Sequence, residues 1–350
     1  MKKILLSALV ALFPMSAMAD YTFVVPQKPG AGTSTWTEIV VSELQKYLDE
    51  KIVISYNPGA RDIPGFNKFH NELMSDDKTV MVSHGGNGVA FLQEKVDYNY
   101  ADYDSIGLMN LNIIAGKKAG ADMSTDVKFA GGSGMVPEGL AMTMLICGPD
   151  KTVDEYVACF KDNVVWVKGM GGGDRRLAFK RGELNGTREN PASFKKHVGP
   201  QIEAGTAEVW FHHGILQADG SHGDDPNYPG LQFEILFEQK YGVAPSGDLY
   251  DAYKLVKSFR DGLQKAIWVR KGNPNAAELR AALTEMANNP ESVAYLQSKV
   301  GLYEWKIGTD GDSQRDTLMT FITPDALSTL VDFNKRAFGL KSIYKDNLVN

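Results

Sequence analysis

The amino-acid sequence predicts an α/β protein with two lobes. Near its start, a short β-branched strand runs into a Pro/Gly turn, a helical pattern and a second strand, which is the typical opening of an open α/β sheet. The chain has 350 residues, which is longer than a single hydrophobic core usually supports. We therefore expect a second lobe. Glycine-rich loops follow several predicted strands, and in such sheets ligands bind at the carboxyl ends of strands.

The first residues have the pattern of a secretory signal peptide. Two lysines precede an apolar run over 4–13, and the small-residue site Ala17-Met18-Ala19 predicts cleavage after Ala19. No cysteine stands at the cleavage point, which argues against a lipid anchor. No later segment reaches roughly 18 uninterrupted apolar residues, the length that spans a bilayer. We therefore expect an exported chain.

Charge and cysteine content narrow the possible functions. The formal net charge is −6, and removing residues 1–19, which hold two lysines and no acid, takes it to −8. An acidic balance argues against nucleic acid as a partner. Cys147 and Cys159 are a candidate disulfide, because an exported chain meets an oxidising compartment. Two separate buried thiols remain the alternative, since spacing does not show whether the two Cβ atoms face each other.

The stretch over 24–36, VVPQKPGAGTSTW, predicts a strand followed by an anion-binding loop. Its glycines let backbone N–H groups approach a ligand at a helix N-terminus, where four donors lack partners within the helix. An ordinary strand-to-helix turn is the alternative. We then expect a helix over 37–49, a strand over 51–56, a shaped Pro/Gly loop over 56–65, a helix over 66–74 and a strand over 78–83.

The second half repeats this pattern. A strand over 106–115 is expected to act as the hinge, and 126–130 opens the second lobe. A glycine loop precedes a helix over 137–145, whose first residue is a proline, as is common at a first helical position. Thr152 with Glu155 three residues later predicts a capped helix to Phe160, followed by a strand over 164–168 and a fourth glycine loop over 169–173.

Four blocks of the sequence resemble the extracytoplasmic solute receptors of tripartite tricarboxylate transporters, the Bug receptors. They are VVPQKPGAGTSTW; NPGARDIPG, similar to Asn-x-Pro-Gly-Ala-x-Gly-x-x-Gly; DDKTVMVS, similar to Pro-Asp-Gly-Tyr-Thr-Leu; and YNYADYDSIGLM, similar to Tyr-x-Pro-x-x-Asp-Phe-x-x-Ile. Weaker matches are FAGGSG, VKGMGGG with FKRGELNG, and KAIWVRKGNPNAAELRAAL. The first loop departs from the family pattern, because no acid starts its helix, and the stretch over 185–230 offers few landmarks.

The resemblance implies a type II periplasmic-binding-protein-like fold, with two α/β lobes and a ligand cleft between them. It implies a first lobe over 20–112 plus 260–350 and a second lobe over 113–259. The expected function is that of a periplasmic receptor, not an enzyme, which holds a small organic carboxylate and delivers it to the membrane components of a tripartite transporter. We expect it to act as a monomer and to need neither cofactor nor metal.

The expected ligand contacts come from four glycine loops, two in each lobe. Backbone N–H groups and hydroxyls would bind the carboxylate, and a histidine after the third strand would donate to it. An alternative for that histidine is a solvated position in the loop. The residues of this expected site are Gln27, Lys28, Gly30, Ala31, Gly32, Thr33, Ser34, Thr35, Ser83, His84, Gly85, Asn87, Gly132, Ser133, Gly134, Gly171, Gly172 and Asp174.

Other kinds of site fit less well. A dinucleotide site needs a third glycine and an acid after the second strand, where Ser55, Tyr56 and Asn57 stand, and no glycine loop continues into the Gly-Lys-Ser/Thr of a P-loop. The group His212, His213, His222, Asp219, Asp224 and Asp225 suggests either a metal site or, as we expect, a polar surface loop, because no i, i+4 histidine pair occurs.

Two other functions stay open at this stage. An exported hydrolase would use Ser133 or Ser34 with His84, and it would need a base within hydrogen-bond reach of the nucleophile. A secreted interaction domain without a small ligand is the third reading. Trp36 would either cover an aromatic ligand or, as we expect, pack against its helix.

Overall fold

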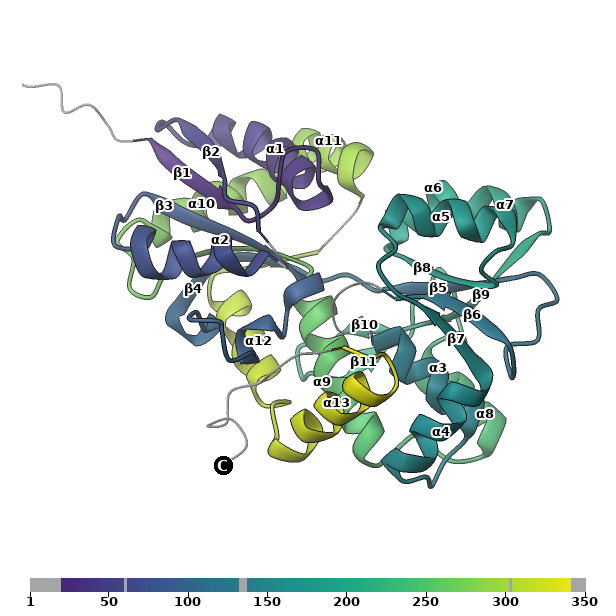
Figure 1. The fold of residues 1–350 in the computed structure, drawn as a ribbon. Coiled ribbons are helices and arrows are strands. Elements are labelled where there is room, and N and C mark those ends of the chain that lie inside the picture. The colour runs from purple at the N-terminus through teal and green to yellow at the C-terminus, as the bar shows by residue number, and fades with distance from the viewer. Residues whose placement is uncertain (1–19, 60–61, 132–136, 302–303, 341–350) are drawn as a thin grey trace, which may run out of the picture.

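The computed structural model of the chain describes residues 20–59, 62–131, 137–301 and 304–340. Two groups of strands, each covered by helices, lie side by side in Figure 1. We call the part built on the six-stranded sheet the first lobe and the part built on the strands β5 to β9 the second lobe. No helix among the described residues combines the length and the apolar character that a membrane span requires.

The first-lobe sheet has the order β13-β4-β12-β3-β1-β2. Its first three strands in the sequence are parallel, whereas β12 is antiparallel to both neighbours, β3 and β4. The chain therefore leaves this lobe after β4 and returns much later to fill the gap between β3 and β4. The strands are β1 (Tyr21–Val25), β2 (Ile52–Tyr56), β3 (Thr79–His84), β4 (Tyr103–Met109), β12 (Lys265–Arg270) and β13 (Trp305–Ile307).

The second lobe repeats this arrangement. β6 pairs with β7 in parallel, β5 is antiparallel to both β8 and β9, and β6 lies beside β8. The order β7-β6-β8-β5-β9 thus matches β2-β1-β3-β12-β4 of the first lobe. The strands are β5 (Ile114–Lys118), β6 (Val127–Ala130), β7 (Val164–Val167), β8 (Gly186–Glu189) and β9 (Ala207–His212), and a separate pair consists of β10 (Ile215–Leu216) and β11 (His222–Gly223).

Helices cover both sheets and fill the junction. α9 (Asp248–Gly262) packs against α3 of the second lobe and α12 of the first, and α13 (Pro324–Arg336) packs against α9 and α4. The longer helices of the first lobe are α1 (Gly32–Leu44), α2 (Ile63–Lys68), α10 (Ala276–Asn288), α11 (Pro290–Val300) and α12 (Thr309–Met319). Those of the second are α3 (Pro137–Cys147), α4 (Val153–Asn163), α5 (Gly172–Arg181), α6 (Pro191–His197), α7 (Gly199–Glu203) and α8 (Phe233–Tyr241).

Short single turns complete the first lobe. They connect strands and helices around the first sheet and are η1 (Gln45–Tyr47), η3 (Phe69–Leu73), η4 (Gly85–Asn87), η5 (Ala90–Leu92) and η6 (Tyr100–Asp102).

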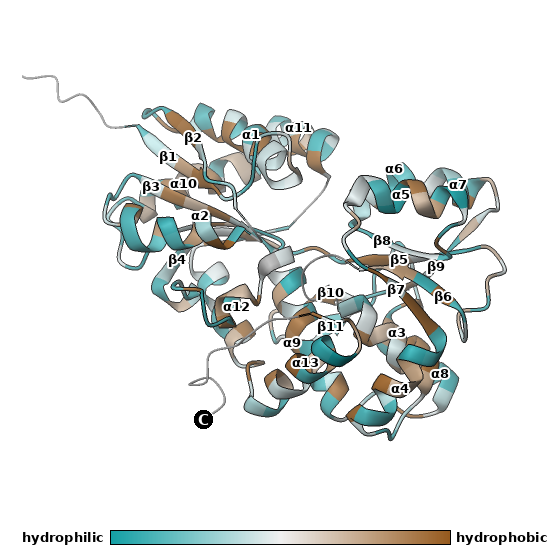
Figure 2. Cartoon of the chain, viewed as in Figure 1, coloured by the Kyte–Doolittle hydropathy of each residue, from teal (hydrophilic) through white to brown (hydrophobic). Residues whose placement is uncertain are grey.

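A hydrophobic core continues from one lobe to the other. Trp268 of the first sheet and Phe129 of the second belong to the same cluster of buried side chains, and Phe259 of α9 lies in it too. A second cluster fills the space between the first sheet and α1, and here Trp36 packs against Trp305 with ring centroids 6.0 Å apart. Trp36 therefore packs in the core. Figure 2 colours most of β7 hydrophobic and much of α5, on the outside of the second lobe, hydrophilic.

Several expected elements form where the local pattern is strong. α4 begins with a capping box in which the Thr152 hydroxyl accepts from the Glu155 N–H and the Glu155 carboxylate accepts from the Thr152 N–H. This reciprocal pair satisfies two of the N–H groups that a helix start leaves free. β2, β3, α3 and β7 also lie within a residue or two of the expected bounds.

Two expectations about element bounds are wrong. The first helix was expected over 37–49 but begins at Gly32, because Thr33 to Trp36 continue the helical turns directly from the glycine loop. The hinge strand expected over 106–115 is two strands, since β4 ends at Met109 and β5 begins at Ile114 in the other sheet. The crossing segment over 110–113 belongs to neither sheet, which the continuous apolar pattern did not indicate.

The segment around β10 and β11 also differs from the expected polar surface loop. His212 and His213 are fully buried and Asp225 is 4% exposed. His213 Nδ1 lies 2.9 Å from the Asp261 carboxylate of α9, and the Asn112 amide donates to Asp225 at 2.8 Å. These pairs connect the segment to α9 and to the crossing after β4. These contacts offset part of the cost of burial, although His213 Nε2, His222 Nε2 and Asp261 Oδ1 are buried without a hydrogen-bond partner among the described residues.

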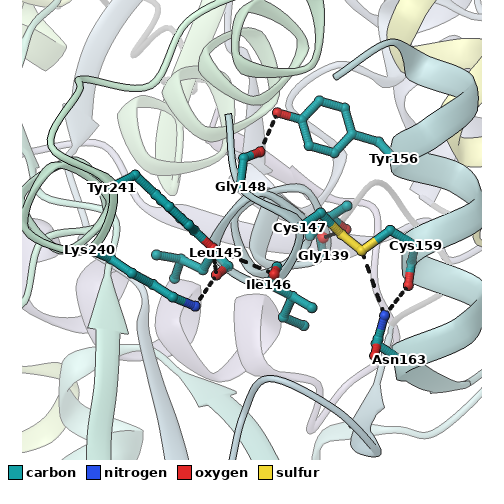
Figure 3. Close-up of a disulfide and its surroundings, with 11 residues drawn as sticks. Gly139, Leu145, Ile146, Cys147, Gly148, Tyr156, Cys159, Asn163, Lys240 and Tyr241 are labelled. Carbon is teal, nitrogen blue, oxygen red and sulfur yellow. Dashed lines mark hydrogen bonds between the residues drawn. A yellow bond between two sulfur atoms is a disulfide. The ribbon is translucent and has the colours of Figure 1, made fainter. Parts of the chain in front are cut away.

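A disulfide joins the end of α3 to α4 (Figure 3). Cys147 and Cys159 are bonded with their Cα atoms 6.1 Å apart, and they are separated by 12 positions in the sequence. Around the bond, the Tyr156 hydroxyl donates to the Gly148 carbonyl at 2.9 Å. The bond fixes the turn between the two helices that cover one side of the second sheet.

We predict that this disulfide stabilises the second lobe. Closing a loop of this length restricts the unfolded chain, so replacing both cysteines with serine is expected to lower the free energy of unfolding by roughly 2–3 kcal/mol. Thermal melts with and without reductant measure this effect. Reductant should lower the melting temperature of the wild type and leave that of Cys147→Ser/Cys159→Ser unchanged. Free alkylation of both thiols without reductant would contradict the prediction.

Candidate ligand-binding site

The loop between β1 and α1 presents an open helix N-terminus. No side chain caps α1 through its N-cap residue, Ala31, and its first turn carries no acid. Gly30 has φ of +79°, which favours glycine, and no atom lies within 4 Å of the position that a Cβ would take at Gly30 or Gly32. Space therefore lies open beside Gly30 and Gly32 at the positive end of the helix dipole, where anions usually bind, although the Thr33 N–H is already paired with Gln27.

A side chain of the loop itself and one of α1 hold this loop in place. The Gln27 side-chain oxygen accepts from the Thr33 N–H at 3.1 Å, and the Ser34 hydroxyl donates to the Lys28 carbonyl at 2.8 Å. Thr33 and Ser34 are buried, whereas Lys28 and Thr35 are exposed. The hydroxyl of Ser34 thus has a structural role within the loop.

The loop after β3 is shaped by its contact with α9. A Cβ at Gly85 would lie 1.8 Å from the Arg260 carbonyl oxygen, so only glycine allows this approach. Ser83 is fully buried, and its hydroxyl accepts from the Trp268 indole N–H at 2.8 Å. Gly85 and Ser83 therefore serve packing, and Asn87 lies in the short turn η4 that follows.

His84 is held between a carboxylate and an amide. Its Nδ1 accepts from the Gly86 N–H at 3.1 Å, so the ring proton belongs on Nε2, which faces the Asp62 carboxylate. The Gln27 amide nitrogen also lies 2.8 Å from this Nε2 and donates to Asp62 at 3.1 Å. Burial lowers the pKa of His84, and nearby Lys265 acts in the same direction while Asp62 opposes it. The imidazole is therefore neutral at pH 7.

Asp62 occupies an unusual backbone conformation. Its φ of +64° lies in the left-handed region, which non-glycine residues adopt at a cost of roughly 1–2 kcal/mol. The residue is 8% exposed and precedes α2. The Asp62 carboxylate contacts both His84 and Gln27. The strained backbone of Asp62 therefore places a carboxylate that orders polar side chains near the N-terminus of α1.

Lys265 places a cation beside the first loop. It is the first residue of β12, at the point where the chain returns to the first lobe, and its Nζ donates to the Thr33 hydroxyl at 3.1 Å. Burial lowers the pKa of Lys265 to about 8, with Asp62 opposing and Arg260 adding to the decrease. The amine is thus mostly charged at pH 7 and loses its proton within about a unit above that.

Two arginines from α9 and β8 meet a buried glutamate. Glu138, in the first turn of α3, is fully buried, and its Oε1 lies 3.4 Å from Arg188 Nη1 and 3.8 Å from Arg260 Nε. Burial alone would raise the pKa of Glu138, but Arg188, Arg260 and His213 lower it to about 2. Burial also lowers the pKa of Arg188 to about 9 against the opposing effect of Glu138. Glu138 and Arg188 are therefore both ionised at pH 7.

These side chains form two contact groups, one around Asp62 and one around Glu138, which we together call the interlobe polar cluster. Arg260 connects its two halves, because its charge acts on His84 and Lys265 of the first lobe and on Glu138 of the second. Three cations face two carboxylates and a neutral imidazole, so the cluster carries an excess of positive charge beside an open helix N-terminus. Its members are Gln27, Asp62, His84, Lys265, Arg260, Glu138 and Arg188.

The residues expected from the sequence fall into different parts of the structure. Gln27 and His84 join the cluster, and Thr33 contacts it through Lys265. Ser34, Ser83 and Gly85 serve local structure, as described above. Gly171 and Gly172 start α5, which has an exposed Asp174 and sends Arg175 to the Arg188 carbonyl at 3.1 Å. Gly132, Ser133 and Gly134 lie outside the described residues.

The charged members Asp62, Lys265, Arg260, Glu138 and Arg188 are absent from the residues expected from the sequence. No sequence motif marks these residues as members of a site, and only the fold brings them together. Two local features could have indicated two of these residues: Lys265 is the first residue of an apolar strand, and Glu138 follows a glycine loop. Among the described residues, no group of three or more His, Cys, Asp or Glu side chains is arranged to hold a metal ion.

Comparison with known proteins gives a likeness at the level of structure. No protein-family model matches the chain, and no curated protein matches its sequence. The periplasmic binding protein BugD superposes with a TM-score of 0.56 at 15% identity, covering 92% of this chain and 98% of its own. A TctC solute-binding protein from Polaromonas gives 0.53 at 14% identity, with coverage of 87% and 97%.

MatC from Rhodopseudomonas palustris, solved with bound malate, also gives 0.53 at 14% identity, with coverage of 93% of this chain and 100% of its own. Identities this low establish the fold alone. The predicted two-lobed α/β architecture is confirmed, and so is the expected resemblance at that level: the chain has the fold of the TctC and Bug solute-binding proteins.

Proposed function

We propose that the chain is an extracytoplasmic receptor that captures a small organic carboxylate between its lobes and delivers it to a tripartite tricarboxylate-type membrane transporter. The interlobe polar cluster is the observation that carries this proposal, because it gathers Lys265, Arg260 and Arg188 from both sides of the junction. The fold shared with MatC, which was solved with malate, supports the same class of ligand. The protein would act in the periplasm as a monomer, after cleavage at Ala19.

The two lobes would move as separate bodies. We propose residues 20–112 and 260–350 as the first and 113–259 as the second, connected by the crossing over 110–113 and the end of α9, although α13 of the first range packs against α4 of the second lobe. A ligand that contacts cations of both lobes binds the closed form better than the open form, and that difference in affinity is what drives closure. Expulsion of water on closure strengthens each charge-assisted hydrogen bond.

We favour a receptor over the exported hydrolase because of how two of the hydrolase's candidate groups, Ser34 and His84, are used; the third, Ser133, lies outside the described residues. The Ser34 hydroxyl donates a hydrogen bond to the Lys28 carbonyl, and His84 Nε2 faces Asp62. A nucleophile needs a base within hydrogen-bond reach that can take its proton. Ser34 and His84 each contribute instead to the frame around the α1 N-terminus, which suits binding.

We predict that a small carboxylate co-purifies with the protein. The receptor purified under native conditions should release an acid of low molecular weight when it is unfolded, detectable by mass spectrometry against a mock purification. Refolded protein should then recover binding of that acid in calorimetry. A released ligand without an acidic group would contradict the proposed ligand class.

We predict that carboxylate affinity depends on the charge of Lys265. The pKa of Lys265 is about 8 in the free protein, so the amine is charged and attracts the carboxylate below that pH and is neutral above it. Affinity should therefore fall about tenfold for each pH unit above 8. Lys265→Met should weaken binding about 10- to 100-fold at pH 7, the effect expected for one charge-assisted hydrogen bond.

The matched control is Lys265→Arg, which stays charged and should show a flatter profile than the wild type between pH 7 and 9, because Arg188, with a pKa of about 9, loses its proton only towards the upper end of this range. Lys128→Met, on the exposed side of the second lobe, controls for loss of a positive charge alone. Titration calorimetry across this pH range measures all four proteins. Equal slopes for the wild type and Lys265→Arg would remove Lys265 from the site.

We also predict that binding closes the lobes. Small-angle scattering at saturating ligand should give a smaller radius of gyration than the free protein, since a ligand bound by both lobes brings them together. Saturation is established beforehand by calorimetry on the same sample. Identical profiles would show that the protein binds without closure.

A further inference from the structure

Glu138 uses only one of its two carboxylate oxygens inside the described part of the chain. Oε1 faces both Arg188 and Arg260, at 3.4 and 3.8 Å. Oε2 is buried and has no hydrogen-bond partner. A buried carboxylate oxygen normally accepts hydrogen bonds, because it has given up those of water.

The two arginines around Glu138 also retain unused donors. The buried Nε atoms of Arg188 and Arg260 have no hydrogen-bond partner among the described residues. The three side chains therefore offer two N–H donors and one carboxylate acceptor in the same place. A ligand fragment complementary to this set combines an acceptor, such as a carboxylate, with a hydrogen-bond donor beside it.

We propose that Glu138 makes the receptor specific for carboxylates that carry an adjacent donor group, either a hydroxyl or an ammonium. This inference rests on the proposed function and names the ligand class more narrowly. Arg188 and Arg260 bind the carboxylate, and Glu138 Oε2 accepts from the donor. A plain carboxylate leaves Oε2 unpaired and meets the repulsion of the Glu138 charge, so it binds more weakly.

A purely structural role would be that of a counterion for the two arginines. That role explains the contacts of Oε1, and removing Glu138 would then weaken all ligands together or reduce stability. It predicts no discrimination between ligands that differ by one donor group. The ratio of affinities within matched ligands therefore separates the two roles.

The test compares matched acids on the wild-type protein by titration calorimetry. Two series are used: succinate, malate and aspartate, and glutarate, 2-hydroxyglutarate and glutamate. In whichever series binds, we expect the hydroxy or the amino acid to bind at least about tenfold more tightly than the plain diacid, as one hydrogen bond to a buried charge requires. The better of the two identifies the donor as a hydroxyl or an ammonium.

The variant Glu138→Gln should reduce this preference about tenfold while still binding the plain diacid, because the charge that repels it is gone. Glu208→Gln, on β9 beside Lys117, is the matched control and should keep the wild-type preference. If Glu138→Gln does not fold, the affinities of the matched acids for the wild-type protein decide the question. Equal affinity for the plain and donor-bearing acids overturns this inference and leaves the receptor intact, whereas absence of binding to every acid overturns both.

Discussion

The junction depends on the close approach of α9 to the glycine loop after β3. A Cβ at Gly85 or Gly88 would lie 1.8 or 2.7 Å from the carbonyl oxygens of Arg260 and Phe259, so side chains there would force the helix away. The approach sets the position of Arg260, and Lys265 follows it by five residues. Because glycine leaves room for the helix end, Arg260 lies beside the loop after β3 and Lys265 reaches Thr33 of the first loop.

The repeated strand order explains why charges from two lobes meet. β8 corresponds to β3 in the matched arrangement, and Arg188 stands near the end of β8 as His84 stands at the end of β3. Carboxyl ends of strands in such sheets carry the ligand-facing groups. Burial of several like charges is unfavourable unless counter-charges accompany them, and Asp62 and Glu138 supply these, one in each lobe.

Local patterns in the sequence predicted most of the fold. Strong β-branched runs, the capping pair at Thr152 and the glycine loops each depend on neighbours in the chain, so they can be interpreted without the structure. The cluster could not be predicted in this way, because Arg260 and Glu138 meet across more than a hundred positions. The burial of His212 and His213 was missed for the same reason, since their surroundings come from α9 and the crossing after β4.

The position of β12 between β3 and β4 has a consequence for how the chain folds. The second lobe is built from one continuous stretch, whereas the first sheet lacks a central strand until residues 265–270 arrive. Contacts between segments so distant in sequence form slowly, because the loop must close before the strand can pair. During folding, the inner edges of β3 and β4 stay unpaired until β12 is available, so the nascent chain is exposed there to pairing with other molecules.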